Sequence, residues 1–371
     1  MVLRNRTIAA DPLGAGAERL RQAAGIPGLA LVVVGVDGPI HASGHGHADL
    51  ATARRVTTRT AFLWFSMTKV VTATVALRLA EEGRLHLDAP VAARHLGSPR
   101  QRGRRPTMRE LLSHTAGLGN PLPIRWVHPA GSEGPSEQVM LARGAKAVGR
   151  RPPGGRARYA NVGYLVAGRL VAEAAGMPFE SCVEETVLGP AGMTETAFAV
   201  PGGLEAATGY VRLPKAADPL MRRVLPAGVV GTRRRDRLSL NPFYVDGPAY
   251  GGLVGSVLDV GRFLQLHLRD GELDGRRVLS PANARLMRAI DRPGTRFDHG
   301  IGWFRRPRRG GEGAGDWVEH LGTGAGFWNV MRLYPGHGLG VAIMANTTSA
   351  YDFEPLFADV VARCGRGAGR D

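Results

Sequence analysis

The sequence predicts an α+β fold, in which an antiparallel sheet built from both ends of the chain is flanked by helices and carries an inserted helical subdomain. Two strand-like runs come early, at residues 28–36 and 39–43, and an Asp-Gly turn joins them. Two more apolar runs, at residues 327–334 and 339–345, come late. Apolar helical stretches lie between, so the simplest assembly pairs the first strands with the last.

We expect a single domain over residues 15–362, with a sheet part at 15–75 and 248–362 and a helical part at 76–247. Periodicity, Gly/Pro punctuation and composition predict the remaining elements. In chain order these are a short helix at 15–25, a buried helix at 66–83, loops with a short helix at 85–119, loops around a helix at 120–158, helices at 159–175 and 178–190, a Pro- and Arg-rich excursion at 200–248, an amphipathic helix at 256–268, a strand at 300–304 and a closing helix at 354–363.

Composition limits the classes of partner. The chain has 371 residues, 44% of them hydrophobic, and a formal charge of +16. Its arginines are scattered and no recognition motif accompanies them, so we expect weak polyanion binding but no specific nucleic-acid partner. Two cysteines are too few for a disulfide framework. The first 24 residues lack an apolar signal segment, and no run approaches the ~18 residues of a membrane helix, which predicts a cytoplasmic protein with no membrane partner.

Residues 61–77 carry the clearest chemical signal. They predict a buried helix that opens at Ser66, because no charge occurs over 70–77. Ser66 and Lys69 are three residues apart and therefore share a helical face. A serine attacks a carbonyl when a base takes its proton, and a lysine becomes such a base when burial lowers its pKa. In a chain that otherwise uses arginine, a lysine on an apolar face favours this chemistry over a surface charge.

Two further stretches could join this site. Tyr159-Ala160-Asn161 follows a Pro/Gly loop at the start of a predicted helix, where a tyrosine near a lysine can act as a base or simply pack under the loop. His320-Leu321-Gly322-Thr323-Gly324 precedes a strand, and its glycines would let backbone N–H groups approach a substrate or merely form a hairpin. His45-Gly46-His47 lacks companions at ligand spacing, so we expect no metal site and no cofactor.

Together these motifs resemble the signatures of the serine β-lactamase-like superfamily, in the branch that holds class C β-lactamases, D-alanyl-D-alanine carboxypeptidases and family VIII carboxylesterases. The resemblance covers nearly the whole chain, and its fold would be the β-lactamase/transpeptidase-like one. The matching stretches, in order, are Ser66-Met67-Thr68-Lys69, Leu111 to Leu118, Tyr159-Ala160-Asn161, Gly251-Gly252-Leu253 and His320-Leu321-Gly322.

The resemblance implies a role for each motif. Ser66 would be the acylated nucleophile, and Lys69 and Tyr159 would share the general-base work. The N–H groups of Ser66 and Thr323 would form the oxyanion hole. The implied substrate-binding residues are Asn161, His320 and Gly322.

One departure bears on the substrate. Lactamases and carboxypeptidases of this branch usually have a lysine where this chain has His320, and that lysine helps to bind a substrate carboxylate. Its absence favours an esterase or acyltransferase that uses a small ester or amide and passes the acyl group to water or another acceptor. The alternatives are a β-lactamase or D-aminoacyl peptidase acting on a lactam or peptide, and a non-catalytic binding protein on the same fold.

Overall fold

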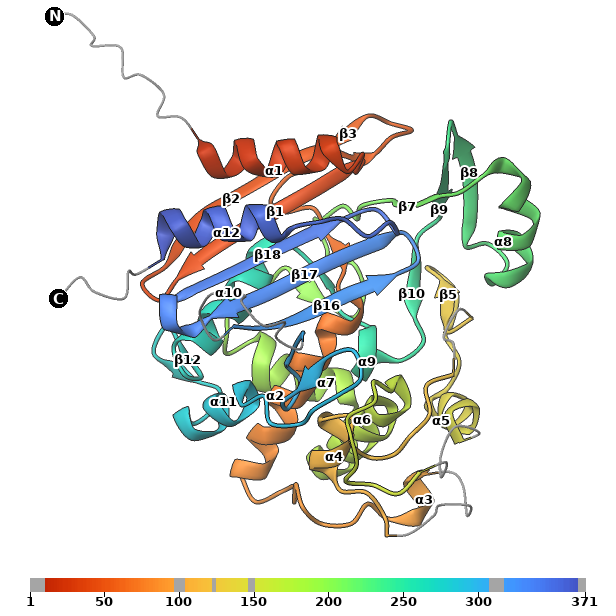
Figure 1. Ribbon diagram of the computed structural model, residues 1–371. Coiled ribbons are helices and arrows are strands. Elements are labelled where there is room, and N and C mark those ends of the chain that lie inside the picture. The colour runs from red at the N-terminus through yellow and green to blue at the C-terminus, as the bar shows by residue number, and fades with distance from the viewer. Residues whose placement is uncertain (1–10, 97–103, 122–124, 146–150, 307–316, 366–371) are drawn as a thin grey trace, which may run out of the picture.

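The computed structural model describes residues 11–96, 104–121, 125–145, 151–306 and 317–365. Its main sheet is antiparallel and joins the two chain ends, as predicted (Figure 1). The central pairing sets Val32 opposite Ala342, between the strand nearest each terminus. The strands, in spatial order, are β14 (Asp298–His299), β15 (Phe304–Arg305), β16 (Val318–Gly324), β17 (Phe327–Tyr334), β18 (Leu339–Ala345), β1 (Gly28–Gly35), β2 (Pro39–Asp49) and β3 (Arg54–Arg55).

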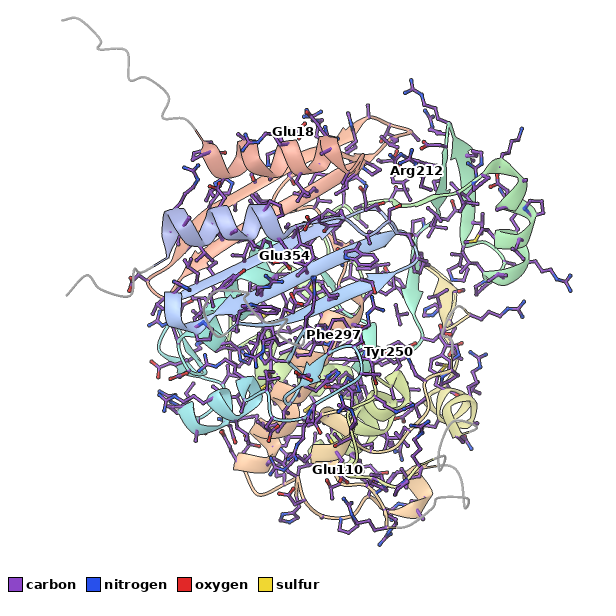
Figure 2. The ribbon with its side chains drawn as sticks, in the orientation of Figure 1. Glu18, Glu110, Arg212, Tyr250, Phe297 and Glu354 are labelled. Carbon is purple, nitrogen blue, oxygen red and sulfur yellow. The ribbon has the colours of Figure 1, made fainter. Side chains whose placement is uncertain are left out.

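Helices cover both faces of this sheet. Alternate residues of a strand point to opposite faces, and β1 shows the consequence. Leu29, Leu31 and Val33 pack with α1 (Pro12–Ala23) and α12 (Glu354–Cys364), whereas Ala30, Val32 and Val34 pack with α10 (Val257–Leu268). Glu18 on α1 and Glu354 on α12 mark the first layer in Figure 2. Both faces are therefore apolar, which explains the unbroken hydrophobic run of β1.

Among the helices beside the sheet, α2 (Thr68–Glu81) is the most deeply enclosed, being buried at every position from Thr68 to Leu77. A 3₁₀ turn, η1 (Phe65–Met67), precedes it, so Ser66 lies one turn before the α-helix that the sequence predicted to open there. The surrounding helices are α3 (Ala93–Leu96), α4 (Met108–Leu112), α5 (Glu137–Ala145), α6 (Asn161–Ala175), α7 (Phe179–Val183) with the π turn Glu184–Leu188, α9 (Pro248–Gly251) and α11 (Pro281–Arg288).

The segment 200–248 is more ordered than its weak periodicity suggested. It contains a small antiparallel sheet, in the order β7 (Gly209–Arg212), β9 (Arg237–Leu240) and β8 (Val230–Arg234), with α8 (Asp218–Val224) beside it (Figure 1). The sequence did not predict this sheet because its strands have only four or five residues, too few to establish a period. The other short elements are β4 (Phe62–Leu63), β5 (Val127–Pro129), β6 (Thr196–Ala197), β10 (Phe243–Val245), β11 (Val254–Gly255), β12 (Glu272–Leu273), β13 (Arg276–Arg277) and the 3₁₀ turns Lys215–Ala217 and Pro335–His337.

Two predictions near the C-terminus were wrong in detail. Residues 300–304 do not form a strand: Gly302 has φ of 81°, and only Phe304 joins β15. Conversely, Val318–Gly324 forms the full strand β16, which the sequence had suggested only as a glycine-rich approach to the next strand. Its three polar or glycine positions in a row weakened the strand signal, and pairing with β17 overrides that local preference.

Candidate active site

Ser66 and Lys69 face each other at the junction of η1 and α2. Lys69 Nζ lies 3.0 Å from Ser66 Oγ and donates to the backbone oxygen of Tyr250 at 2.8 Å. The lysine side chain is completely buried, and burial lowers its pKa well below the usual 10.5. Phe65, directly before the serine, has φ of 46°, a left-handed conformation that a bulky residue rarely adopts and that often accompanies a functional turn.

The partner of Lys69 comes from a distant part of the chain. Tyr250 belongs to α9, and the neighbouring carbonyl of Ala249 accepts from Thr72 Oγ1 at 2.7 Å. Two successive carbonyls thus bind two residues of α2 that lie three apart on one face. Figure 2 shows Tyr250 below strand β16 of the main sheet. This contact fixes the lysine in place through an uncharged acceptor. A carbonyl stabilises a charged amine less than a carboxylate would, so the effect of burial on the pKa of Lys69 is not cancelled.

Tyr159 lies against this pair. Its ring centroid is 5.0 Å from Lys69 Nζ, and its phenol also interacts with the Ser66 hydroxyl. Burial raises the pKa of the phenol well above 10, and the contact with Ser66 lowers it only in part. The residue precedes α6, which begins at Asn161 rather than at Tyr159 as the sequence suggested.

Asn161 opens α6 beside the tyrosine. Its backbone N–H donates to Asn120 Oδ1 at 3.0 Å. The side-chain oxygen of Asn161 is buried and has no hydrogen-bond partner within the described part of the chain. A buried amide oxygen without a partner is costly, so this atom is suited to receive a hydrogen bond from a bound molecule.

Strand β16 brings the third motif to the same place. A Cβ on Gly322 would collide with the carbonyl oxygen of Trp64, and one on Gly324 with the ring of Phe65. These glycines therefore let β16 lie directly on the turn that carries Ser66. Asn329 on β17 strengthens the contact by donating to the carbonyl of Leu63 at 2.8 Å.

His320 is buried in this strand, with 1% of its surface exposed. Its Nδ1 lies 2.8 Å from the carbonyl oxygen of Leu321, which can only accept, so Nδ1 carries the proton and Nε2 is an acceptor. Nε2 has no partner among the described residues. Burial and nearby Lys69 lower the pKa of His320 well below 6.5. Glu319 points to the other face, where it binds Arg332 at 2.6 Å.

The motifs enclose a cavity of about 700 Å³. Ser66, Tyr159, Asn161, His320 and Thr323 all line it, whereas Lys69 lies behind Ser66 and Gly322 lies beneath the turn. The structure thus brings together every residue that the sequence singled out for the site. The further lining residues are Leu118, Gly119, Asn120, Ala157, Arg158, Thr295, Arg296, Phe297, His299, Phe304, Leu321 and Trp328.

Sequence reasoning missed the side of the cavity formed by residues 295–304. His299 belongs to β14, its ring centroid lies 6.4 Å from that of Tyr159, and burial lowers its pKa to about 4. Nothing in the sequence around His299 sets it apart. His114 also packs on Tyr159, and here a signal existed, because His114 lies in the matched stretch 111–118.

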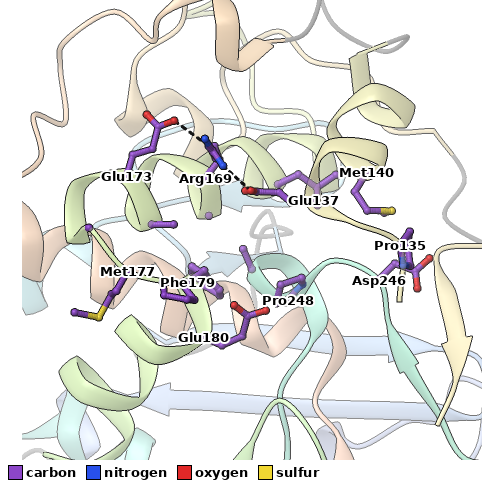
Figure 3. A pocket seen from close by; sticks show the side chains of 16 residues that line it. Pro135, Glu137, Met140, Arg169, Glu173, Met177, Phe179, Glu180, Asp246 and Pro248 are labelled. Carbon is purple, nitrogen blue, oxygen red and sulfur yellow. Dashed lines mark hydrogen bonds and ion pairs between the residues drawn. The ribbon is translucent and has the colours of Figure 1, made fainter. Parts of the chain in front are cut away.

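A second cavity, of about 500 Å³, is lined by residues of α5, α6, α7 and α9 (Figure 3). Arg169 bridges Glu137 and Glu173 on its wall. None of the predicted site residues lines it.

Across the described ranges, no group of three or more His, Cys, Asp or Glu side chains could hold a metal ion. No helix in those ranges is both long enough and apolar enough to cross a bilayer. Cys182 and Cys364 are free thiols.

Comparison with known proteins agrees with this architecture. The family profile described as Beta-lactamase matches residues 16–361. Penicillin-binding protein 4 of Amycolatopsis lactamdurans is 29% identical over 349 residues, which cover 91% of this chain and 85% of that protein.

Two solved structures share the fold. D-amino acid amidase from Ochrobactrum anthropi SV3, complexed with L-phenylalanine, superimposes with a TM-score of 0.75 at 21% identity, covering 93% of this chain and 94% of its own. EstCE1, a hydrolase with promiscuous acyltransferase activity, gives a TM-score of 0.73 at 22% identity, covering 94% and 97%.

The fold and the family match define a serine hydrolase of the β-lactamase superfamily. The chain belongs to the beta-lactamase family, since the profile spans nearly all of it. The resemblance inferred from the motifs is thereby confirmed.

Proposed function

We propose that the chain hydrolyses small esters or amides through an acyl intermediate on Ser66. One observation carries the proposal: a fully buried lysine amine lies 3.0 Å from the hydroxyl of Ser66, and the serine lines a cavity of about 700 Å³. Burial lowers the pKa of the amine well below its usual value and so favours the neutral form, and a neutral amine can accept the serine proton as Oγ attacks a carbonyl carbon.

Tyr159 acts with Lys69 rather than as a resident phenolate. Burial favours a neutral Lys69 amine beside a neutral Tyr159 phenol over an ammonium beside a phenolate, because both charged groups would lose their hydration. Lys69 is therefore the base that accepts the serine proton, and the phenol relays a proton to the leaving group as the tetrahedral intermediate collapses. Water then attacks the acyl group on Ser66, with the same pair working in reverse.

The oxyanion hole is assigned to the backbone N–H groups of Ser66 and Thr323. Both residues line the cavity, one from η1 and the other from β16, and the contact of Gly322 with Trp64 holds the two segments together. N–H groups fixed in this way stabilise the developing negative charge on the substrate oxygen without having to reorganise.

His320 and Asn161 favour an uncharged, hydrogen-bonding substrate. Each presents a buried acceptor without a partner in the described residues, His320 through Nε2 and Asn161 through Oδ1. An acceptor would bind an N–H or O–H donor of the substrate, whereas the lysine usual at the position of His320 would bind a carboxylate. A short amide or hydroxy-ester fits these contacts better than a lactam acid.

A lactam or peptide substrate has support from a different observation. Arg158 and Arg296 are exposed at the cavity, and the described residues that line it include no carboxylate. This positive rim would attract an anionic substrate. Transfer to an acceptor other than water is the third candidate, since EstCE1, which shares the fold, is described as having such activity.

Labelling with a fluorophosphonate probe tests the acylation step. The wild type should be labelled at Ser66, Ser66→Ala should not, and peptide mapping should locate the adduct. A protein that is folded but unlabelled would instead favour a non-catalytic binding protein on this fold. A panel of p-nitrophenyl esters, nitrocefin and D-alanyl peptides then separates esterase, lactamase and peptidase.

A further inference from the structure

His114 holds the backbone on both sides of Tyr159. It follows α4 and the capping residue Ser113, with φ of 60° in the left-handed region. Its carbonyl oxygen accepts from the N–H of Arg158 at 2.8 Å, and its Nδ1 accepts from the N–H of Ala160 at 3.1 Å. A single residue therefore binds both neighbours of the tyrosine.

The imidazole of His114 also packs on the phenol itself. The two ring centroids are 4.5 Å apart with a 35° angle between the planes. The imidazole also packs against Tyr164, with ring centroids 5.3 Å apart, and forms a T-shaped contact with His299 at 4.9 Å. Tyr164 is in turn fixed, because its hydroxyl donates to the carbonyl of Leu112 at 2.8 Å.

We propose that His114 is the positioning residue that keeps the Tyr159 phenol within reach of Ser66 and Lys69. It does not touch the cavity or the reacting atoms, so it acts through the tyrosine. This inference rests on the proposed function for the role of Tyr159, and it adds a group that none of the three motifs supplies.

Histidine suits this position because it combines an acceptor with a flat ring. Donation from Ala160 requires a lone pair on Nδ1, so the neutral ring carries its proton on Nε2. A protonated ring would set an N–H against the N–H of Ala160. Burial, together with His299, Lys69 and His320, holds the pKa of His114 well below 6.5, which preserves the acceptor.

Two substitutions separate the stacking of the His114 ring from the hydrogen bond that its Nδ1 accepts. His114→Phe keeps an aromatic ring and removes the acceptor. His114→Asn keeps an acceptor and tolerates a positive φ, but removes the ring. The control is His95→Asn, which changes another buried histidine that pairs with Glu173 at 3.2 Å outside the site.

The rate of fluorophosphonate labelling of Ser66 is measured for each variant, alone and combined with Tyr159→Phe. We expect His114→Phe to slow labelling roughly 10- to 100-fold, since a misplacement of ~1 Å can cost about 10²-fold. His114→Asn should recover part of that loss, and His95→Asn should label at the wild-type rate even if it melts earlier. On Tyr159→Phe, His114→Phe should cost less than about threefold, because the coupled partner is already gone.

A purely structural role for His114 would slow labelling by the same factor with and without the Tyr159 hydroxyl, and that result would overturn the proposal. Crystal structures of wild type and His114→Phe give a second readout. A Tyr159 ring displaced from Ser66 supports positioning, and an unmoved ring refutes it. If wild-type Ser66 is not labelled, the proposed function fails, and the ring position alone then decides the role of His114.

Discussion

Replacing Lys69 tests the proposal that its amine, with a pKa lowered by burial, acts as the base for Ser66. Two variants separate the positive charge of the lysine from its ability to accept a proton. Lys69→Arg keeps a permanent positive charge, since a guanidinium does not lose its proton in proteins. Lys69→Met keeps a long apolar side chain of similar volume and removes the amine. A base role predicts that both variants lose acylation by roughly 10²- to 10⁴-fold, the usual contribution of general acid–base catalysis.

The stability of the two variants should differ. Lys69 is 0% exposed, and its Nζ has two uncharged partners, Ser66 Oγ and the Tyr250 carbonyl. A guanidinium in that place would remain charged without an acidic partner, which costs several kcal/mol. Lys69→Met removes the donor to both groups: Ser66 Oγ still lines the cavity, whereas the buried Tyr250 carbonyl is left unpaired, a loss of about 1–3 kcal/mol. We expect Lys69→Met to be the more stable variant.

The free energy of unfolding should depend on pH, because Lys69 has different pKa values in the folded and unfolded protein. Burial lowers the pKa of Lys69 in the folded protein, while an unfolded lysine titrates near ~10.4. Between those two values the unfolded chain binds one more proton, so the free energy of unfolding rises with pH. Relative to Lys69→Met, the wild type should gain up to about 1.4 kcal/mol per pH unit, until the unfolded lysine loses its proton.

Urea unfolding at several pH values between 7 and 10 measures that difference, and fluorophosphonate labelling measures acylation under the same conditions. Two results would contradict a base role for Lys69: parallel stability curves for wild type and Lys69→Met, or Lys69→Arg labelling near the wild-type rate. Either would mean that the lysine supplies positive charge and not a base.

Three further substitutions test the other proposed roles. Ser66→Ala should abolish labelling and lower the free energy of unfolding by only ~1 kcal/mol, because the hydroxyl caps no helix and its loss removes the hydrogen bond from Lys69 Nζ; retained labelling would indicate another nucleophile. Tyr159→Phe should fold normally and lose on the order of 10²- to 10⁴-fold in turnover; a loss below tenfold would favour a packing role. For His320, we expect kcat/KM for a short p-nitrophenyl ester to exceed that for nitrocefin at pH 7.5, because the pKa of this histidine is lowered and the ring is neutral. His320→Lys should move that ratio toward nitrocefin, and a wild type that prefers nitrocefin would support the lactamase alternative.

Short-range patterns accounted for much of the fold. The helix before the first strand was predicted at 15–25 and lies at Pro12–Ala23, where Asp11 caps it by accepting from Gly14 at 2.9 Å. The last two strands were predicted at their observed bounds, since long apolar runs carry a strong signal. The division into sheet and helical parts and the cytoplasmic location remain predictions.

The site contains both features that short-range patterns predict and features that they do not. Ser66 and Lys69 could be paired from sequence because a helical turn brings them together within three residues. The Tyr250 carbonyl that holds Lys69 is 181 positions away, and backbone oxygens have no residue-type signature. His299 reaches the cavity through a two-residue strand at the sheet edge, a position that only the pairing of β14 with β15 defines.

The same distinction explains why the chemistry was easier to predict than the substrate. The proposed nucleophile and its proposed base are three residues apart, so their residue types and spacing alone predict acyl transfer. In the proposed function, substrate choice depends on Arg158, Arg296 and the His320 Nε2 acceptor, which three separate segments bring to one cavity. The acceptor draws uncharged donors and the arginines draw anions, so the two features favour different substrates. The acceptor lies buried within the cavity, whereas both arginines are exposed and screened by salt, so the contact with His320 should dominate at physiological ionic strength. A preference for esters over nitrocefin that grows as salt is raised would show that balance directly.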